Sequence, residues 1–130
     1  MGSRERNTGA RWERQAKKFA AELTGHLHWR RTDGGEKQWN GDLIPCNGRD
    51  GPVDKINAGK FYVECKFRKK IQRRHVKEWI RTIIKNSCGD ERRWLLLIKQ
   101  DGGPIIVFDS TLPKDENGYY MARITWFGSE

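Results

Sequence analysis

Residues 60–67 read KFYVECKF, and the alternation of their side chains decides how the rest of the chain is interpreted. Successive side chains of a strand point to opposite faces, so alternate positions form two sets. One set is apolar and the other is largely polar: Phe61, Val63, Cys65 and Phe67, against Tyr62, Glu64, Lys66 and Arg68. The pattern predicts a strand with one face in the core. It also places Glu64 and Lys66 on the other face, with their Cα atoms about 6–7 Å apart.

An amphipathic helix is predicted on each side of this strand in the sequence. Apolar residues recur at helical spacing in Gly9–Leu23 and again in Val76–Asn86. Thr8 suits the N-cap of the first helix, and Gly25 suits its end. At about 100° per residue, Glu13 lies about 75° from the centre of the apolar stripe, at the border of the buried face.

The remaining chain supplies short strands and turns. Strands are predicted at residues 27–32, 41–45, 94–99, 105–108 and 121–127, with a turn at 33–36 and loops at 47–52 and 113–118. The order is a helix, three strands, a helix, and two or three strands, which indicates an α/β fold with one mixed central sheet flanked by helices. The length fits a single domain, residues 1–130, with residues 1–8 as a flexible N-terminal arm.

Charge and composition restrict the class of protein. The chain has 26 Lys and Arg against 17 Asp and Glu, a formal net charge of +9 at pH 7, and clustering of the basic residues favours a nucleic-acid partner over charge that serves solubility alone. No apolar run reaches the roughly 18–20 residues that span a bilayer, and residues 1–14 lack the apolar core of a signal peptide. Three cysteines without a CxxC pair argue against a disulfide framework or a zinc ribbon. We therefore expect an intracellular protein in a reducing compartment, with no membrane association.

The residues suited to catalysis are acidic ones within this basic chain. The motifs GxGxxG, GxxxxGK[ST] and GxSxG are absent, and Cys65 is predicted to be a core residue because it shares the apolar face of its strand. Asp42 opens the predicted strand 41–45, and Glu64 lies on the next clear strand. Two carboxylates from neighbouring strands form a hard oxygen site that suits Mg²⁺, with Mn²⁺ as a substitute. Lys66 beside them would hold the attacking water or stabilise charge on a phosphate.

A structural interpretation of the same residues is simpler. Glu-x-Lys on a strand is a common tripeptide that usually forms a surface ion pair worth about 0–1 kcal/mol. Most glutamates at a helix border, as Glu13 is, are solvated. The specificity of the pattern rises because Asp42 precedes the Glu64 and Lys66 pair and an opening helix carries Glu13.

Three segments together resemble the PD-(D/E)xK nuclease superfamily: residues 9–15 (GARWERQ), 41–44 (GDLI) and 62–66 (YVECK). Their order and compactness are most similar to the archaeal-type Holliday junction resolvases and their phage relatives. The match covers residues 9–86, and the rest of the chain fits only as compatible strands. Asp42 follows Gly41 where the superfamily motif has a proline, a common variation.

The resemblance implies a restriction-endonuclease-like αβββαβ core and a catalytic site built on it. Asp42 and Glu64 would hold Mg²⁺, and Glu13 would lie near them from the first helix and contribute to metal binding, directly or through water. Lys66 would be the catalytic lysine of the motif. Thr32 would be the accessory hydroxyl residue that the archaeal-type resolvases tend to carry near the first strand.

The partners implied by the resemblance are DNA and a second copy of the chain. Related resolvases are homodimers that nick opposite strands of a four-way junction symmetrically, which would place an interface on the later strands, Trp126 or Phe127. DNA contacts are expected from basic residues of three clusters: Arg11, Arg30, Arg31, Arg68, Lys69, Lys70, Arg73 and Arg74. No small-molecule cofactor is expected.

Two other functions stay open. One is a PD-(D/E)xK endonuclease that acts on other DNA, of the repair, homing or restriction type, although 130 residues leave little room for a base-reading element. The other is a basic DNA-binding module without catalysis, which would use exposed aromatic residues such as Trp29 or Trp39 for stacking. Incubation of a synthetic junction and a linear duplex of matching sequence, each with Mg²⁺ or Mn²⁺, distinguishes the three.

Overall fold

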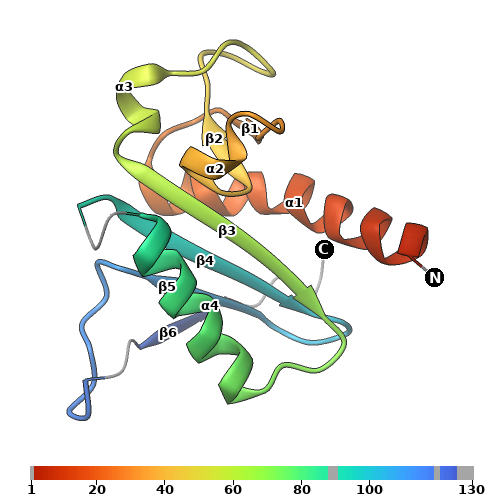
Figure 1. Cartoon of the computed structure of the whole chain (residues 1–130), viewed down its shortest axis with the longest axis vertical. Coiled ribbons are helices and arrows are strands. Elements are labelled where there is room, and N and C mark those ends of the chain that lie inside the picture. Colours follow the sequence, from red (N-terminus) through yellow and green to blue (C-terminus); the bar gives the residue numbers. More distant parts are fainter. Residues whose placement is uncertain (1, 88–90, 119–120, 126–130) are drawn as a thin grey trace.

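The computed structural model describes residues 2–87, 91–118 and 121–125, and it has the α/β architecture that the sequence predicts (Figure 1). The elements follow in the order α1 (Gly2–Thr24), β1 (Trp29–Arg31), α2 (Lys37–Asn40), β2 (Leu43–Pro45), α3 (Lys55–Ala58), β3 (Phe61–Arg68), α4 (Arg73–Asn86), β4 (Arg93–Gln100), β5 (Ile105–Asp109) and β6 (Ala122–Thr125). The helices α2 and α3 are single turns of four residues each. Without them, the order is one helix, three strands, a second helix and three further strands.

The six strands form one sheet in which their spatial order is their order in the chain, from β1 to β6. Strands β3 and β4 run parallel, and the other neighbouring pairs are antiparallel. A parallel pair needs a crossover of about a dozen residues or more, and the 14-residue helix α4 provides it. The sheet is therefore mixed, and β3 lies inside it with a neighbour on each side.

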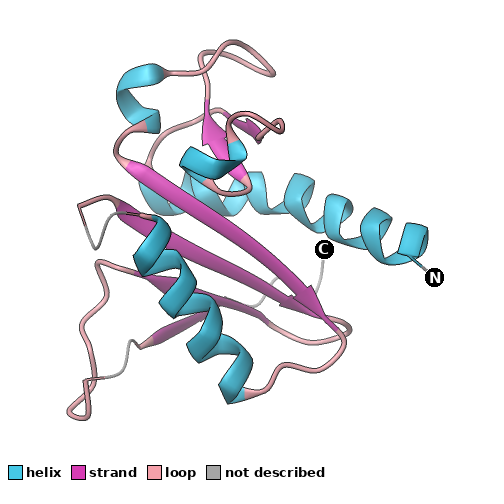
Figure 2. Cartoon of the chain, viewed as in Figure 1, coloured by secondary structure: helices cyan, strands magenta, loops and turns pink. Residues whose placement is uncertain are grey.

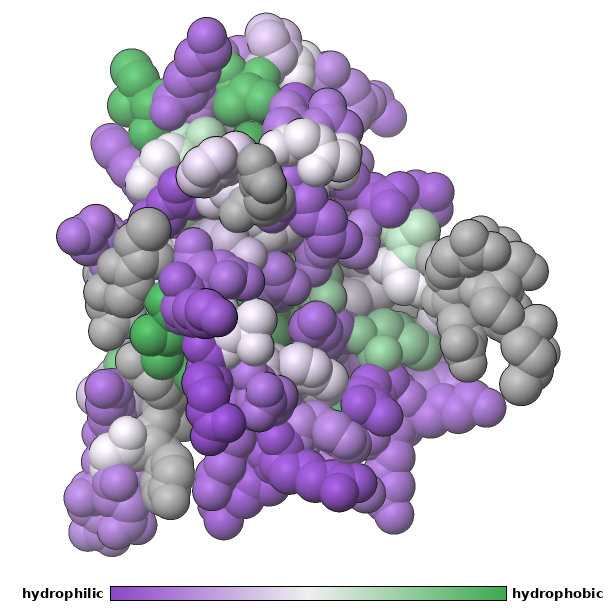
Figure 3. All heavy atoms as spheres, in the orientation of Figure 1, coloured by the Kyte–Doolittle hydropathy of each residue, from purple (hydrophilic) through white to green (hydrophobic). Residues whose placement is uncertain are grey.

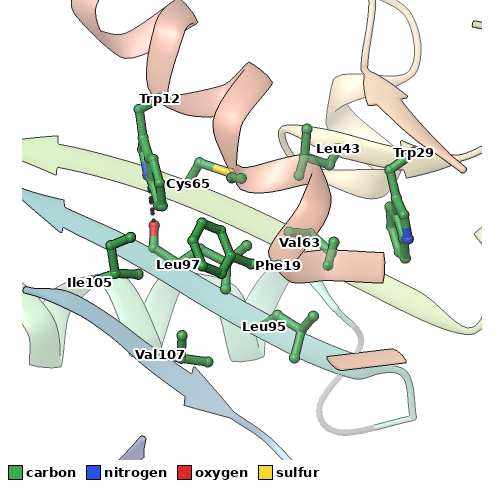
Figure 4. Close-up of a cluster of buried hydrophobic side chains, with 12 residues drawn as sticks. Trp12, Phe19, Trp29, Leu43, Val63, Cys65, Leu95, Leu97, Ile105 and Val107 are labelled. Atoms are coloured by element: carbon green, nitrogen blue, oxygen red, sulfur yellow. Dashed lines mark hydrogen bonds between the residues drawn. The ribbon is translucent and has the colours of Figure 1, made fainter. Parts of the chain in front are cut away.

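Helices α1 and α4 cover opposite faces of this sheet (Figure 2). On the α1 face, Trp12 and Phe19 pack in one cluster with apolar side chains of β3, β4 and β5. The indole of Trp12 also donates a hydrogen bond of 3.1 Å to the carbonyl oxygen of Leu97, which satisfies its polar atom inside the core (Figure 4). On the α4 face, Ile83 packs with Trp94 and neighbouring side chains. Among the described residues, no helix has the length and hydrophobicity of a membrane span.

The alternation predicted for β3 is confirmed. Val63 and Cys65 lie in the core beneath α1, and Tyr62 lies in the core beneath α4. Cys65 is thus a core residue, as predicted, and its burial raises the pKa of the thiol well above its usual value. Cys46 is also a buried free thiol, whereas Cys88 lies outside the described residues.

Several predicted boundaries are wrong. The first helix begins at Gly2, so Thr8 lies inside α1 rather than at its N-cap. The apolar period starts only at Trp12, because residues 2–8 include no apolar side chains at helical spacing. Gly25 ends the helix as predicted, with φ of +80° and its N–H bonded to the carbonyl of Ala21.

The later elements agree more closely. Helix α4 begins at Arg73, three residues before the predicted start, because its first residues are basic and carry no apolar period. Strands β4, β5 and β6 lie at the predicted positions to within two residues. The residues predicted for a dimer interface, Trp126 and Phe127, lie outside the described residues.

Candidate functional site

The backbone at Gly41 approaches β3 more closely than a residue with a β-carbon permits. Gly41 has φ of +79°, and a β-carbon there would lie 2.5 Å from the carbonyl oxygen of Val63. Glycine is therefore required on both conformational and steric grounds. The N–H of Asp42 donates to the same Val63 carbonyl at 2.7 Å, and the hydroxyl of Thr32 donates to the carbonyl of Gly41 at 2.7 Å. These contacts hold Asp42 against the middle of β3.

The carboxylate of Asp42 is buried, with 5% of the side chain exposed. Its Oδ2 accepts a 2.8 Å hydrogen bond from the backbone N–H of Cys65, so Asp42 bonds to the main chain on both sides of Glu64. Its Oδ1 lies 3.0 Å from Nζ of Lys37, which α2 supplies. This hydrogen bond and the charge of Asp42 raise the pKa of Lys37. The orientation of the Asp42 carboxylate is therefore fixed by one backbone amide and one ammonium group.

Glu64 forms a pair with Asp42. Burial, the largest cause, and the neighbouring Asp42 carboxylate together raise the pKa of Glu64 to about 7. Lys66, whose Nζ is 3.8 Å from Oε2, opposes this shift in the Glu64 pKa but does not cancel it. Glu64 therefore binds a proton at a higher pH than an ordinary glutamate does.

Two neighbours on β3 flank this pair on the same face. The hydroxyl of Tyr62 donates to Oε1 of Glu64 at 3.2 Å. Burial and the charge of Glu64 raise the pKa of Tyr62 to about 12, so the hydroxyl remains a donor at physiological pH. On the other side, the ammonium of Lys66 lies 6.0 Å from the ring centroid of Trp79 on α4, within the range of a cation–π contact.

The raised pKa of Glu64 makes stability depend on pH. A carboxyl whose pKa is higher in the folded state stabilises that state below its unfolded pKa, and this contribution is lost as the pH rises through the folded pKa. Between pH 4.5 and about 7, Glu64 should therefore lower the free energy of unfolding by up to about 3 kcal/mol. Urea unfolding of the wild type and Glu64→Gln in EDTA across this range checks it. The difference between the two should grow with pH, and parallel curves would contradict a raised pKa.

The donor set fits a hard divalent cation. Mg²⁺ usually keeps several waters and binds to proteins through one or two carboxylates, together with substrate phosphates. Two adjacent carboxylates repel each other unless a proton or a cation offsets their charge, and this repulsion by Asp42 is one cause of the raised pKa of Glu64. Within residues 2–87, 91–118 and 121–125, no three side chains among His, Cys, Asp and Glu converge on one metal position. The described site thus offers the pair Asp42 and Glu64 rather than three acids.

Glu13 is the acidic residue that the structure leaves outside the pair. It lies at the border of the buried face of α1, as the helical period predicts, and 17% of its side chain is exposed. Its Oε1 accepts a 2.7 Å hydrogen bond from Arg31 on β1. Its charge still reaches the site, because it contributes to the raised pKa values of Lys37 and Cys65.

The basic residues expected to bind DNA fall into two groups. Arg30 and Arg31 are ion-paired, the first through two hydrogen bonds of 2.8 and 2.6 Å to Glu36 and the second with Glu13. The others are exposed; Arg11 lies on α1, and the remaining five form the β3–α4 cluster, defined as Arg68, Lys69, Lys70, Arg73 and Arg74. At about 3.3 Å per residue, this cluster begins roughly 13 Å along β3 from Glu64. In the described part of the chain, no ion pair joins this cluster to an acidic side chain, whereas both arginines of β1 are paired.

Two residues of the site were missed as functional candidates. Lys37 follows a turn and belongs to a four-residue helix, which is too short to show a helical period. Tyr62 was assigned to the correct face of β3, and its spacing of two residues from Glu64 was the signal that it could reach that carboxylate. Thr32 does lie next to Gly41 and Asp42, where its hydroxyl and its N–H bind their two carbonyl oxygens.

Comparison with known proteins adds no name to this site. No protein-family model matches the chain, and no curated protein or solved structure shows a significant match. The chain is thus an α/β protein whose most distinctive feature is a buried aspartate and a partly buried glutamate side by side, with a lysine near each.

Proposed function

We propose that this protein is a Mg²⁺-dependent endodeoxyribonuclease of the PD-(D/E)xK type that acts on four-way DNA junctions, as a Holliday junction resolvase does. One observation carries the proposal: the buried carboxylate of Asp42 lies beside the partly buried carboxyl group of Glu64, and lysine ammonium groups lie 3.0 Å from the first and 3.8 Å from the second. The motif spacing in residues 9–86 and the order of the main elements support the same function.

The residues of the pair have separate roles in this proposal. Asp42 and Glu64 would hold Mg²⁺, or Mn²⁺ in its place. Bound there, the cation would polarise a phosphoryl oxygen and lower the pKa of the water that attacks phosphorus. Lys66 is more exposed than Glu64, with 38% of its side chain accessible against 15%, so its ammonium lies on the substrate side. It would orient the attacking water and stabilise the charge that develops on the phosphate.

The other residues position these groups. The backbone N–H of Cys65 and the ammonium of Lys37 fix the two oxygens of Asp42. Tyr62 holds Oε1 of Glu64 and, with its raised pKa, does not itself compete as an anion. Thr32 and Gly41 set the backbone that presents Asp42.

Charge supports DNA as the substrate. The chain has a net charge of +9, and the exposed β3–α4 cluster lies on the strand that carries Glu64 and Lys66. Basic side chains of this kind contact phosphates, so they respond to the shape of the DNA backbone rather than to its base sequence. Recognition by shape suits a small domain that binds a branched substrate.

The test uses an end-labelled four-way junction beside a linear duplex of matching sequence, each with Mg²⁺, Mn²⁺ or EDTA. We expect paired, symmetric nicks in the junction alone, and only with a divalent cation. Equal cleavage of the linear duplex would retain the nuclease and replace the substrate with that of a repair, homing or restriction-type enzyme. Binding without cleavage under either cation would leave a basic DNA-binding module.

Symmetric nicking requires two active sites, so we also propose a homodimer. Light scattering coupled to size-exclusion chromatography should then give a mass of twice the 15.2 kDa of one chain for the free protein, and the mass of one junction plus two chains for the complex. A monomer both alone and on the junction would contradict paired cleavage by one particle.

A further inference from the structure

A groove lies next to the candidate site, on the other side of α2. It has a volume of about 410 Å³ and is lined by side chains of α2, β2, α3 and the segment before β4, among them Trp39, Ile44, Val53, Lys55, Ala58 and Arg92. Its size lies within the range of small-ligand sites. Figure 3 shows hydrophobic surface gathered at the end of the molecule that carries α3, on a face that is otherwise largely hydrophilic.

One exposed wall of this groove is an aromatic ring. The side chain of Trp39 is 62% exposed. By contrast, the three tryptophans of the core, Trp12, Trp29 and Trp94, are at most 5% exposed. A flat apolar group stacked on this indole would remove the exposed ring surface from water, which favours binding. The ring therefore offers a binding face to a planar partner.

The backbone beneath Trp39 is held firmly. Arg92, from a distant part of the sequence, donates a hydrogen bond to the carbonyl oxygen of Trp39. The next residue, Asn40, is buried and donates from Nδ2 to the carbonyl of Ala58 at 2.6 Å. The ring is thus presented from a fixed position, which lowers the entropy cost of binding a planar partner.

The charge around the ring identifies the kind of partner. Lys55 and Arg92 contribute positive charge to the groove, and its acidic residue, Glu36, is neutralised by two hydrogen bonds from Arg30. A flat ring attached to a phosphate chain matches an indole with cations beside it. A nucleobase of a DNA strand has both features.

The helix α2 connects this ring to the candidate active site. Lys37, which contacts Asp42, and Trp39 are two residues apart, so at about 100° per residue their side chains point about 200° apart around the axis. A helix is about 10–12 Å across with its side chains, a span of about three bases at 3.4 Å each. A strand whose phosphate lies at Asp42 and Glu64 would therefore reach Trp39 within a few nucleotides.

We propose that Trp39 is a stacking platform for an unpaired nucleobase close to the cleaved phosphate. This inference rests on the proposed nuclease function and adds a specificity-determining residue to it. A base inside a duplex has no free face for the indole, whereas a base at a branch point or bulge does. Trp39 thereby favours DNA with disrupted stacking over a regular duplex.

The test measures binding of the full chain in EDTA to two fluorescent DNAs. Both contain 2-aminopurine, as a single unpaired base in one duplex and as a paired base in the other. Trp39→Ala should weaken binding of the unpaired-base DNA about 5- to 100-fold, because stacking on an aromatic residue is worth that much per base, and it should abolish the fluorescence change of the probe. Affinity for the paired duplex should stay within about twofold. Trp39→Phe should retain part of both effects.

Leu27→Ala is the matched control, since Leu27 is a large apolar residue, 74% exposed, that lines a different groove. It should leave both DNAs unaffected. Equal affinity of wild type and Trp39→Ala for the unpaired-base DNA would overturn the platform, as would equal losses for both DNAs. Junction cleavage by the wild type is measured separately, and it shows whether the proposed nuclease function fails together with the proposed role of Trp39. A wild type that never cuts but shows the Trp39 effect would refute the nuclease alone.

Discussion

Asp42→Asn should reduce metal-dependent cleavage of a four-way junction by at least about 1,000-fold and leave the junction bound. The asparagine oxygen can still accept the hydrogen bond from the N–H of Cys65, so the backbone arrangement at Asp42 is kept. The asparagine side chain supplies no negative charge for a cation, however. In place of Oδ1 it would turn its NH₂ group, a donor, towards the ammonium of Lys37, which is also a donor. Single-turnover cleavage with Mg²⁺ and binding in EDTA measure the two effects separately.

The sign of the binding change is part of the prediction. Removal of one negative charge from a surface that faces phosphates should leave the affinity in EDTA unchanged or slightly higher. Asp50→Asn is the matched control, because it makes the same change in charge in an exposed loop, at a φ of 52° that asparagine adopts readily. Its cleavage rate should equal that of the wild type. Loss of binding as severe as loss of cleavage would show that Asp42 is structural and would count against the assignment.

The parts of the site that the sequence could predict are those set by local periodicity. The period of two in residues 60–67 placed Glu64 and Lys66 on one face and Cys65 on the other, and the structure has the same arrangement. The helical period of α1 likewise placed Glu13 at the border of the buried face. Both predictions depend only on the regular direction of side chains along one helix or strand. They can therefore be made without knowing which elements pack against it.

Contacts between elements could not be predicted in this way. The bond of Glu13 to Arg31 depends on how α1 lies over β1, and the bond of Lys37 to Asp42 depends on a four-residue helix that follows a turn. Periodicity does not register a helix that short. The sequence therefore suggested three converging acids, where the described structure has two with lysines beside them.

Gly41→Ala should be the most disruptive single-methyl change near the site. The new β-carbon would lie 2.5 Å from the carbonyl oxygen of Val63 and 3.2 Å from Oε1 of Glu64, in a backbone conformation with φ of +79°. A backbone with φ of +79° and ψ of −137° is adopted almost only by glycine and costs another residue about 1–3 kcal/mol, and forcing the strand apart adds about 1–3 kcal/mol. Urea unfolding should therefore show a loss of about 2–6 kcal/mol, and cleavage should fail because Asp42 moves away from Glu64.

Gly48→Ala separates the two causes. Gly48 has nearly the same φ, +80°, but a β-carbon there would meet nothing within 4 Å, so only the conformational cost of about 1–2 kcal/mol applies. The difference between the two variants then measures the steric approach of Gly41 to β3. If that difference is near zero and Gly41→Ala still cleaves, the chain at residue 41 has room to move. In that case the close contact with Val63 would not be what holds Asp42 beside Glu64, and the pair would have to be maintained by Thr32, Lys37 and the N–H of Cys65 alone.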